Sequence, residues 1–80
     1  MVGLRTSTGQ VVTGVKLHAG NQAVARGVRT SEIINALKHP VSVRPGYGGA
    51  TRYSGVSAEV RVSASGRIIT LIRFKGPNDR

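Results

Sequence analysis

The stretch AEVRVSASGRIITLIRF, residues 58–74, contains two strands and the turn on which the fold of this chain depends. Apolar and polar residues alternate from Ala58 to Ser63, which is the period of a half-exposed strand. Ala64-Ser65-Gly66 predicts a tight connection, and the run from Arg67 to Phe74 predicts the longest and most apolar strand. Because connections this short favour antiparallel neighbours, residues 58–74 predict a β-hairpin.

Two further strands are expected upstream of this hairpin. Residues 41–44 alternate valines with Ser42 and Arg44, and residues 51–56 form the next candidate strand. The glycine-rich segment 45–49 lies between them and predicts a loop. Together with the hairpin, these segments predict a meander of about four antiparallel strands.

Helical patterns precede the strands. A short, weak helix is expected around Ala19–Ala25, and Gly27 is suited to end it in the left-handed conformation. In the second helix Thr30 is expected to be the N-cap, with Glu32 in the first turn, where the helix dipole favours an acid. Pro40 forbids its continuation.

The order of these elements predicts an α+β domain, with two N-terminal helices packed on one face of a roughly four-stranded antiparallel sheet. Residues 1–15 are rich in Gly, Ser and Thr and are interpreted as a flexible lead-in, in which Gln10 to Lys16 is a candidate short strand. The domain itself is assigned to residues 16–75, and residues 76–80 to a frayed tail.

The composition restricts the function. Twelve Lys and Arg stand against three acids in 80 residues, a net charge of +9, and the usual partner of such a domain is a nucleic-acid backbone. The acids are Glu32, Glu59 and Asp79, and their separation disfavours a two-metal nuclease or a carboxylate-pair glycosidase. Without cysteine, and with two distant histidines, no metal site or cofactor is expected. No apolar run approaches the ~20 residues of a membrane span, and no signal peptide is recognisable.

Arginines mark the predicted sheet as the anion-binding region. Five of them fall on or beside predicted strands, and guanidinium groups match phosphate geometry in a planar fork. These residues are Arg44, Arg52, Arg61, Arg67 and Arg73. A solubilising surface is the alternative interpretation, although such a surface would carry both signs of charge. Tyr47 and Tyr53 are candidates for stacking on a base, and Tyr53 is equally well explained as a tyrosine at the edge of the core.

His18 and Thr70 are the candidate reactive residues. An imidazole is the natural general base near neutral pH, and His18 follows Lys16 in the pattern Lys-x-His. The alternative is a histidine without a role at the start of the helix, and His39 is interpreted as a helix C-terminal cation. Strict alternation puts Thr70 on the apolar face of the last strand, where a hydroxyl needs a partner or a function.

Three segments, in this order and spacing, carry a resemblance to a known family. They are VRTSEIINALKHP (28–40), RYSG (52–55) and GRIITL (66–71). They resemble the small ribonuclease toxins of the barnase/EndoU/colicin/RelE-like superfamily, above all the C-terminal toxin domains of contact-dependent growth inhibition and other polymorphic toxin systems of bacterial competition. The resemblance covers residues 16–74 and implies a helix bearing a histidine in front of a four-stranded antiparallel sheet.

The resemblance also implies site residues. His18 matches the catalytic histidine with Lys16 as a charge stabiliser, Thr70 matches the threonine of the last strand, and Arg67 matches the arginine that opens it. The strand with Arg52 and Tyr53 lines the cleft in this family. Together with the strand arginines Arg44 and Arg73, these two residues are expected to contact RNA.

The implied activity is that of a metal-independent endoribonuclease toxin that cleaves RNA by attack of the ribose 2′-hydroxyl, leaving a 2′,3′-cyclic phosphate. Transfer RNA is the expected substrate, and the cytoplasm of a target cell is the expected site of action, reached as part of a larger secreted or surface-displayed protein. A monomer with an acidic cognate immunity protein or antitoxin is expected.

Two other functions explain the charge without catalysis. A basic RNA-binding module needs neither His18 nor Thr70. A domain that binds an acidic protein predicts weak, salt-sensitive RNA binding that does not distinguish ribose from deoxyribose.

Overall fold

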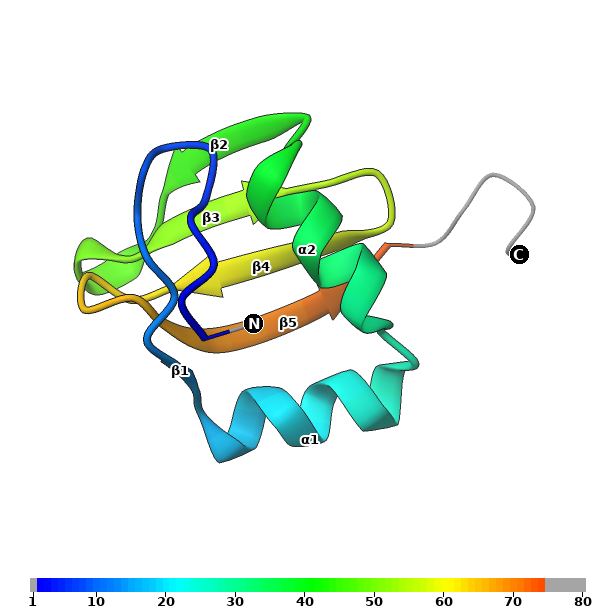
Figure 1. Cartoon of the computed structure of the whole chain (residues 1–80). Coiled ribbons are helices and arrows are strands. Elements are labelled where there is room, and N and C mark those ends of the chain that lie inside the picture. The colour runs from blue at the N-terminus through cyan, green and yellow to red at the C-terminus, as the bar shows by residue number, and fades with distance from the viewer. Residues whose placement is uncertain (1, 75–80) are drawn as a thin grey trace.

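A five-stranded sheet in the order β1-β5-β4-β3-β2 forms the centre of the computed structural model, which describes residues 2–74 (Figure 1). The strands are β1 (Gly14–Val15), β2 (Ser42–Pro45), β3 (Thr51–Ser54), β4 (Ala58–Val62) and β5 (Arg67–Arg73). The predicted antiparallel meander is confirmed for β2 to β5. β1 adds a fifth strand parallel to β5, so the sheet is mixed, and the prediction of about four antiparallel strands was one short strand too few.

Both predicted helices are present, as α1 (Leu17–Arg26) and α2 (Thr30–Lys38). Gly27 ends α1 with φ 65° and ψ 31°, the left-handed conformation expected there. The N-cap of α2 is Arg29 rather than Thr30, and the carboxylate of Glu32 accepts a hydrogen bond of 2.9 Å from the backbone N–H of Arg29. None of the helices in residues 2–74 is long and apolar enough to cross a bilayer.

The core lies on one face of the sheet, beneath α2 and the N-terminal segment (Figure 1). Close approach of α2 to the sheet depends on Gly55, because a Cβ built there would lie 2.8 Å from the Cα of Ala36. The core cluster consists of Val12, Ala19, Val28, Ile33, Ala36, Leu37, Tyr53, Ala58, Val60, Val62, Ile68 and Leu71.

The N-terminal segment, over its described residues 2–13, is part of the packed domain rather than a flexible lead-in. Val12 is completely buried, and the N–H of Ser7 donates to the carbonyl of Leu37 in α2 at 2.8 Å. The phenolic oxygen of Tyr53 lies 3.0 Å from the hydroxyl of Thr6 and 2.9 Å from the side-chain oxygen of Gln10. Polar side chains thus fasten this segment across the sheet. The predicted frayed tail at 76–80 lies outside the described residues.

α1 lies along the outer edge of β5, below the sheet in Figure 1. The N–H of Lys16 donates to the carbonyl of Ile68 at 2.9 Å, which continues the pairing begun by β1. Farther along, the N–H of Leu71 donates to Oε1 of Gln22 at 3.0 Å, and Nη1 of Arg26 donates to the carbonyl of Leu71 at 2.6 Å. Two helix side chains therefore occupy backbone groups that a neighbouring strand would otherwise take.

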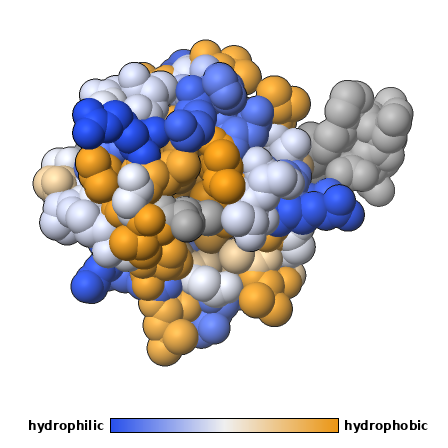
Figure 2. Space-filling model, in the orientation of Figure 1, coloured by the Kyte–Doolittle hydropathy of each residue, from blue (hydrophilic) through white to orange (hydrophobic). Residues whose placement is uncertain are grey.

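The outward side of α1 carries two exposed apolar side chains among polar ones. Leu17 and Val24, two helical turns apart, are 81% and 86% exposed. Apolar side chains are visible at the surface along the lower edge of the molecule, where α1 lies (Figure 2).

Candidate functional site

The face of the sheet opposite α2, here called the open face, carries three arginines side by side. The strand register pairs Arg44 of β2 with Arg52 of β3, Arg52 with Arg61 of β4, and Arg61 with Thr70 of β5. We call these four residues the arginine row. Neighbouring residues on paired strands lie about 5 Å apart, so the row presents cations at a spacing suited to a phosphodiester backbone.

Glu59 lies beside the arginine row and connects two of its members. Its carboxylate accepts a hydrogen bond of 3.1 Å from Nη2 of Arg52 and one of 2.8 Å from Nε of Arg61. The hydroxyl of Ser54 donates to the same carboxylate at 3.1 Å. With only 4% of its surface exposed, Glu59 is buried by the side chains around it, contrary to the half-exposed position expected from the sequence.

The environment of Glu59 keeps its carboxyl group ionised. Desolvation by burial raises its pKa, but the hydrogen bonds from Arg52, Arg61 and Ser54 outweigh that effect and lower the pKa below its ordinary value. The carboxylate therefore holds both guanidinium groups in fixed orientations. The side chains of Arg52 and Arg61 remain 39% and 36% exposed, so both are accessible to a ligand.

Thr70 belongs to the open face, not to the apolar face predicted from strict alternation. The pairing of β4 with β5 shifts register between Arg61 and Val62, so that Arg61 pairs with Thr70 while Val62 pairs with Ile68. The shift leaves Ile69 as the extra residue of a β-bulge. Ile68 is consequently buried in the core, whereas Thr70 continues the arginine row.

His18 is an exposed residue in the first turn of α1, and its ring is held by Gln22 one turn later. Nε2 of Gln22 lies 3.0 Å from Nε2 of His18, while Oε1 of Gln22 accepts from the N–H of Leu71. Because the backbone N–H can only donate, it fixes the orientation of the Gln22 amide. The amide therefore turns its –NH2 group toward His18, and a hydrogen bond forms there when Nε2 of the ring is the acceptor.

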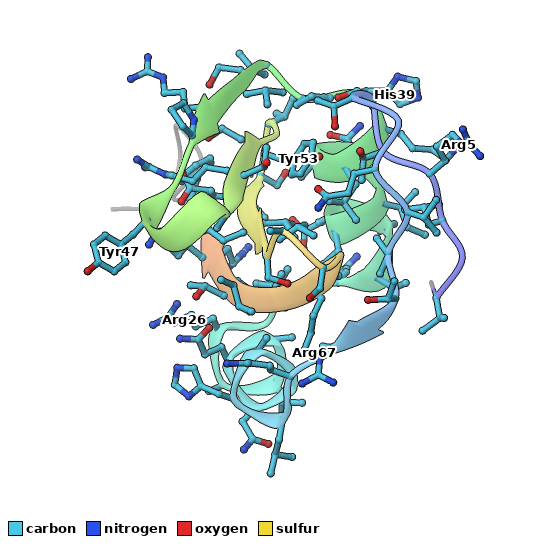
Figure 3. All side chains as sticks on the ribbon, turned by 90° about the vertical axis from the view of Figure 1, so that its left-hand side faces the viewer. Arg5, Arg26, His39, Tyr47, Tyr53 and Arg67 are labelled. Carbon is cyan, nitrogen blue, oxygen red and sulfur yellow. The ribbon has the colours of Figure 1, made fainter. Side chains whose placement is uncertain are left out.

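Lys16 and Arg67 lie at the beginning of β5, near the start of α1. Both residues are exposed, and the backbone of Lys16 is bonded to Ile68, next to Arg67. The side chain of Arg67 extends along β1, since its Nε would be 4.0 Å from a Cβ built on Gly14. Figure 3 shows Arg67 directed toward β1 and α1, below the sheet. The structure thus groups Lys16 and Arg67 at one end of the β5 edge, separate from the arginine row.

Two residues predicted to contact RNA do not lie on the open face. Tyr53 is fully buried and its hydroxyl is occupied by the N-terminal segment, so its ring has no surface on which a base could stack. Arg73 is exposed at the end of β5, but it pairs with the buried Ala58, and the register therefore assigns it to the other face from Thr70. Of the four residues predicted to bind RNA, Arg44 and Arg52 are the ones in the arginine row.

Sequence reasoning overlooked three residues of this site. Composition does not distinguish Arg61 from the other strand arginines, although its alternation with Val60 and Val62 places it opposite the core. Glu59 was treated only as an isolated acid, although it stands two residues from Arg61 on the same face. For Gln22 the sequence offers a weaker indication: residues four apart on a helix can contact each other, and Gln22 follows His18 at this spacing.

The chemistry of the site is that of cations, hydroxyls and an imidazole. Within residues 2–74, no cluster of three His, Cys, Asp or Glu side chains is arranged to hold a metal ion. The exposed groups of the open face are hydrogen-bond donors suited to a polyanion, and the imidazole beside β5 is the group best suited to proton transfer. Comparison of the chain with protein-family models, with curated proteins and with solved structures gave no match.

Proposed function

We propose that this domain is a metal-independent endoribonuclease, which binds RNA on the open face and cleaves it beside β5. The observation that carries the proposal is the position of His18. α1 is fastened along β5 through Gln22 and Arg26, so this histidine lies on the helix that borders the strand whose Thr70 ends the arginine row. An imidazole, a hydroxyl and arranged guanidinium groups are the parts that metal-free phosphodiester cleavage requires.

The arginine row supplies the binding energy in this proposal. Within the described residues Arg61 uses only Nε to bond Glu59, which leaves its two terminal nitrogens for a phosphate. Thr70 pairs directly with Arg61, so its hydroxyl can contact the same phosphate. Arg44 and Arg52 extend the cationic surface to the far edge of the sheet for a neighbouring phosphate.

The proposed reaction is an in-line transfer within one nucleotide. Nε2 of His18 accepts the proton of the ribose 2′-hydroxyl, which takes the place of the Gln22 amide, and the 2′-oxygen bonds to phosphorus. The bond from phosphorus to the 5′-oxygen breaks, and that oxygen leaves with a proton from an acid or from water. Arg61 and Thr70 stabilise the charge on the non-bridging oxygens, while Lys16 and Arg67, at their end of the β5 edge, add positive charge at longer range. The products are a 2′,3′-cyclic phosphate and a 5′-hydroxyl.

The wider role follows the resemblance to ribonuclease toxins. We propose transfer RNA as the substrate class and an acidic immunity protein or antitoxin as the partner that covers the open face. The charge of +9 favours such a partner, because oppositely charged surfaces associate quickly and exclude RNA from the same arginines. The site of action would be the cytoplasm of a target cell.

Cleavage of total RNA in the presence of a chelator tests the proposal. We expect discrete fragments with 2′,3′-cyclic phosphate ends, and we expect His18→Ala to lower the rate by about 100-fold or more. Thr70→Val keeps the shape of the side chain and removes its hydroxyl, so a loss of about tenfold is expected. His39→Ala is the matched control, because His39 is the C-cap of α2 and lies on the other side of the sheet from Tyr47 (Figure 3).

The alternative, a binding module without catalysis, uses the same open face and predicts a different result. In that case no fragments form, and the His18→Ala variant binds RNA as tightly as the parent. Cleavage of a DNA copy or of RNA with 2′-deoxyribose at the cleaved position would contradict the proposed chemistry. Unchanged cleavage by both His18→Ala and Thr70→Val would show that the reactive groups lie elsewhere.

A further inference from the structure

Among the exposed large hydrophobic residues of the described chain, Tyr47 has the highest exposure, in contrast to the other tyrosine. Its side chain is fully exposed, whereas Tyr53 is fully buried. Scattered exposed apolar residues need no explanation in themselves, so exposure alone assigns no role to Tyr47. The structure of its loop and its position next to the arginines indicate that the exposed ring has a function.

The loop that carries Tyr47 is short and internally closed. The N–H of Gly46 donates to the carbonyl of Ala50 at 2.8 Å, and residues 47–49 form a 3₁₀ turn. Gly48 and Gly49 adopt φ values of 68° and 82°, which side chains larger than glycine rarely accept. The turn therefore fixes the backbone of Tyr47 and leaves its ring unpacked, with both faces open to a ligand.

This loop joins β2 and β3, the strands of Arg44 and Arg52, at the outer end of the arginine row. Tyr47 follows Arg44 by three residues, so their Cα atoms lie within about 11 Å. A Cβ built on Gly46 would lie 3.3 Å from Cγ of Arg52, which shows that the loop rests against the stem of that arginine. Figure 3 shows Tyr47 on the side of the sheet away from α2, and Tyr53 on the side of α2.

We propose that Tyr47 forms a subsite for one unpaired base of RNA, next to a phosphate bound by Arg44 and Arg52. A flat, exposed aromatic ring beside guanidinium groups is the arrangement on which single-stranded nucleic acids stack. Bases inside an A-form duplex have both faces covered by their neighbours and cannot use such a ring. The subsite therefore selects single-stranded segments, such as loops, and places the unpaired nucleotide at the β2–β3 end of the open face. This inference rests on RNA being the ligand, as proposed above, but not on its cleavage.

Binding of an RNA that cannot be cleaved tests the subsite separately from catalysis. A short oligomer with 2′-O-methyl groups lacks the nucleophile, so its affinity is measured by fluorescence anisotropy with the whole chain. We expect Tyr47→Ala to weaken binding of the single-stranded oligomer about tenfold, and Tyr47→Phe to leave it unchanged. A duplex of the same length should bind both variants as it binds the parent.

The matched control is Val56→Ala, which removes another exposed apolar side chain, 75% exposed, from the loop between β3 and β4. It should not change the affinity. A thermal melt of Tyr47→Ala should coincide with that of the parent, because the replaced ring contacts solvent. Equal affinities of Tyr47→Ala and the parent for the single strand, or an equal loss with the duplex, would overturn the proposal.

A direct signal comes from Tyr47→Trp, since the chain contains no tryptophan. Stacking should quench the fluorescence of the new ring when the oligomer binds, and an oligomer with abasic sites should not quench it. If the domain binds the oligomer and quenches this signal but cleaves no RNA, the subsite stands and the nuclease proposal fails. Binding without quenching would mean that Tyr47 serves another ligand, such as a protein.

Discussion

The two faces of the sheet differ in the side chains that they bury and in those that they expose. The face beneath α2 buries apolar side chains, and its largest polar residue, Tyr53, has its hydroxyl bonded by Thr6, Thr8 and Gln10. The open face leaves the arginine side chains partly exposed and buries the carboxylate of Glu59, which pairs with two of them. The comparison shows that the apolar core and the RNA-binding arginines lie on opposite faces of one sheet, so variants of the covered face should leave RNA affinity unaltered.

The largest effect should come from filling the contact between α2 and the sheet. Gly55→Ala would put a Cβ 2.8 Å from the Cα of Ala36, and neither backbone can move without opening the core. We expect a loss of about 3 kcal/mol in the free energy of unfolding, measured by urea denaturation. RNA affinity of the folded fraction should be unchanged. A stability equal to that of the parent would mean that α2 does not cross the sheet at Gly55.

A smaller loss should follow from removing one hydroxyl of the covered face. Tyr53→Phe deprives Thr6, Thr8 and Gln10 of their common partner, and Thr6 is itself only 5% exposed. We expect a destabilisation of about 1–2 kcal/mol in urea denaturation, with faster hydrogen exchange in residues 2–13. Tyr47→Phe, which removes an exposed hydroxyl, should not change the stability. If both variants unfold alike, the N-terminal segment is not fastened by Tyr53.

The open face contributes to stability in a way that depends on pH. Because the pKa of Glu59 is lowered in the folded state, its contribution to stability is complete above the ordinary glutamate pKa of about 4.5 and is lost as the pH falls through the pKa of the folded state. Thermal unfolding between about pH 6 and pH 3 should show a falling Tm for the parent and a smaller fall for Glu59→Gln. Glu32→Gln, at the start of α2, controls for the general effect of removing an acid. If Tm depended on pH equally in Glu59→Gln and in the parent, the ion pairs of Glu59 with Arg52 and Arg61 would not stabilise the fold.

The smallest effect, and of the opposite sign, is expected in α1. A Cβ built on Gly20 meets no atom within 4 Å, and this residue lies inside a helix. Gly20→Ala should therefore stabilise the domain by about 0.5–1 kcal/mol, because alanine loses less backbone entropy. Differential scanning calorimetry would measure the rise in Tm. A destabilisation would show that the helix is packed more closely at Gly20 than the structure indicates.

Features that depend on local sequence were predictable, and features that depend on pairing between strands were not. Gly27 and Pro40 mark the helix ends through their own backbone restrictions, so both ends were found. Alternation assigned Val60 and Val62 to the core because β4 is regular. The same rule failed for Thr70, since counting along one strand does not reveal the extra residue that the register shift in β5 introduces.

The packing of the N-terminal segment in the domain was not predictable from the sequence for a related reason. Its Gly, Ser and Thr residues have no period of their own, and their order comes from partners far along the chain, such as Tyr53 and Leu37. The candidate site was predictable in part. Arg44 and Arg52 follow from charge and strand pattern, whereas the pairing of Glu59 with Arg52 needs the alignment of two strands.

The two helix side chains that bond Leu71 also bear on the behaviour of the protein in concentrated solution. A sheet with an unpaired edge recruits strands from other molecules, and this is how many small β-rich domains aggregate. Here Gln22 and Arg26 occupy both backbone groups of Leu71, and β1 protects the start of the same edge. At the opposite edge β2 is only four residues long and ends at Pro45, which has no N–H to offer. Both edges of the sheet are thus protected against pairing with other molecules, which favours colloidal stability. Fraying of α1 would expose the edge of β5, the longest strand of the domain, to strands of other molecules.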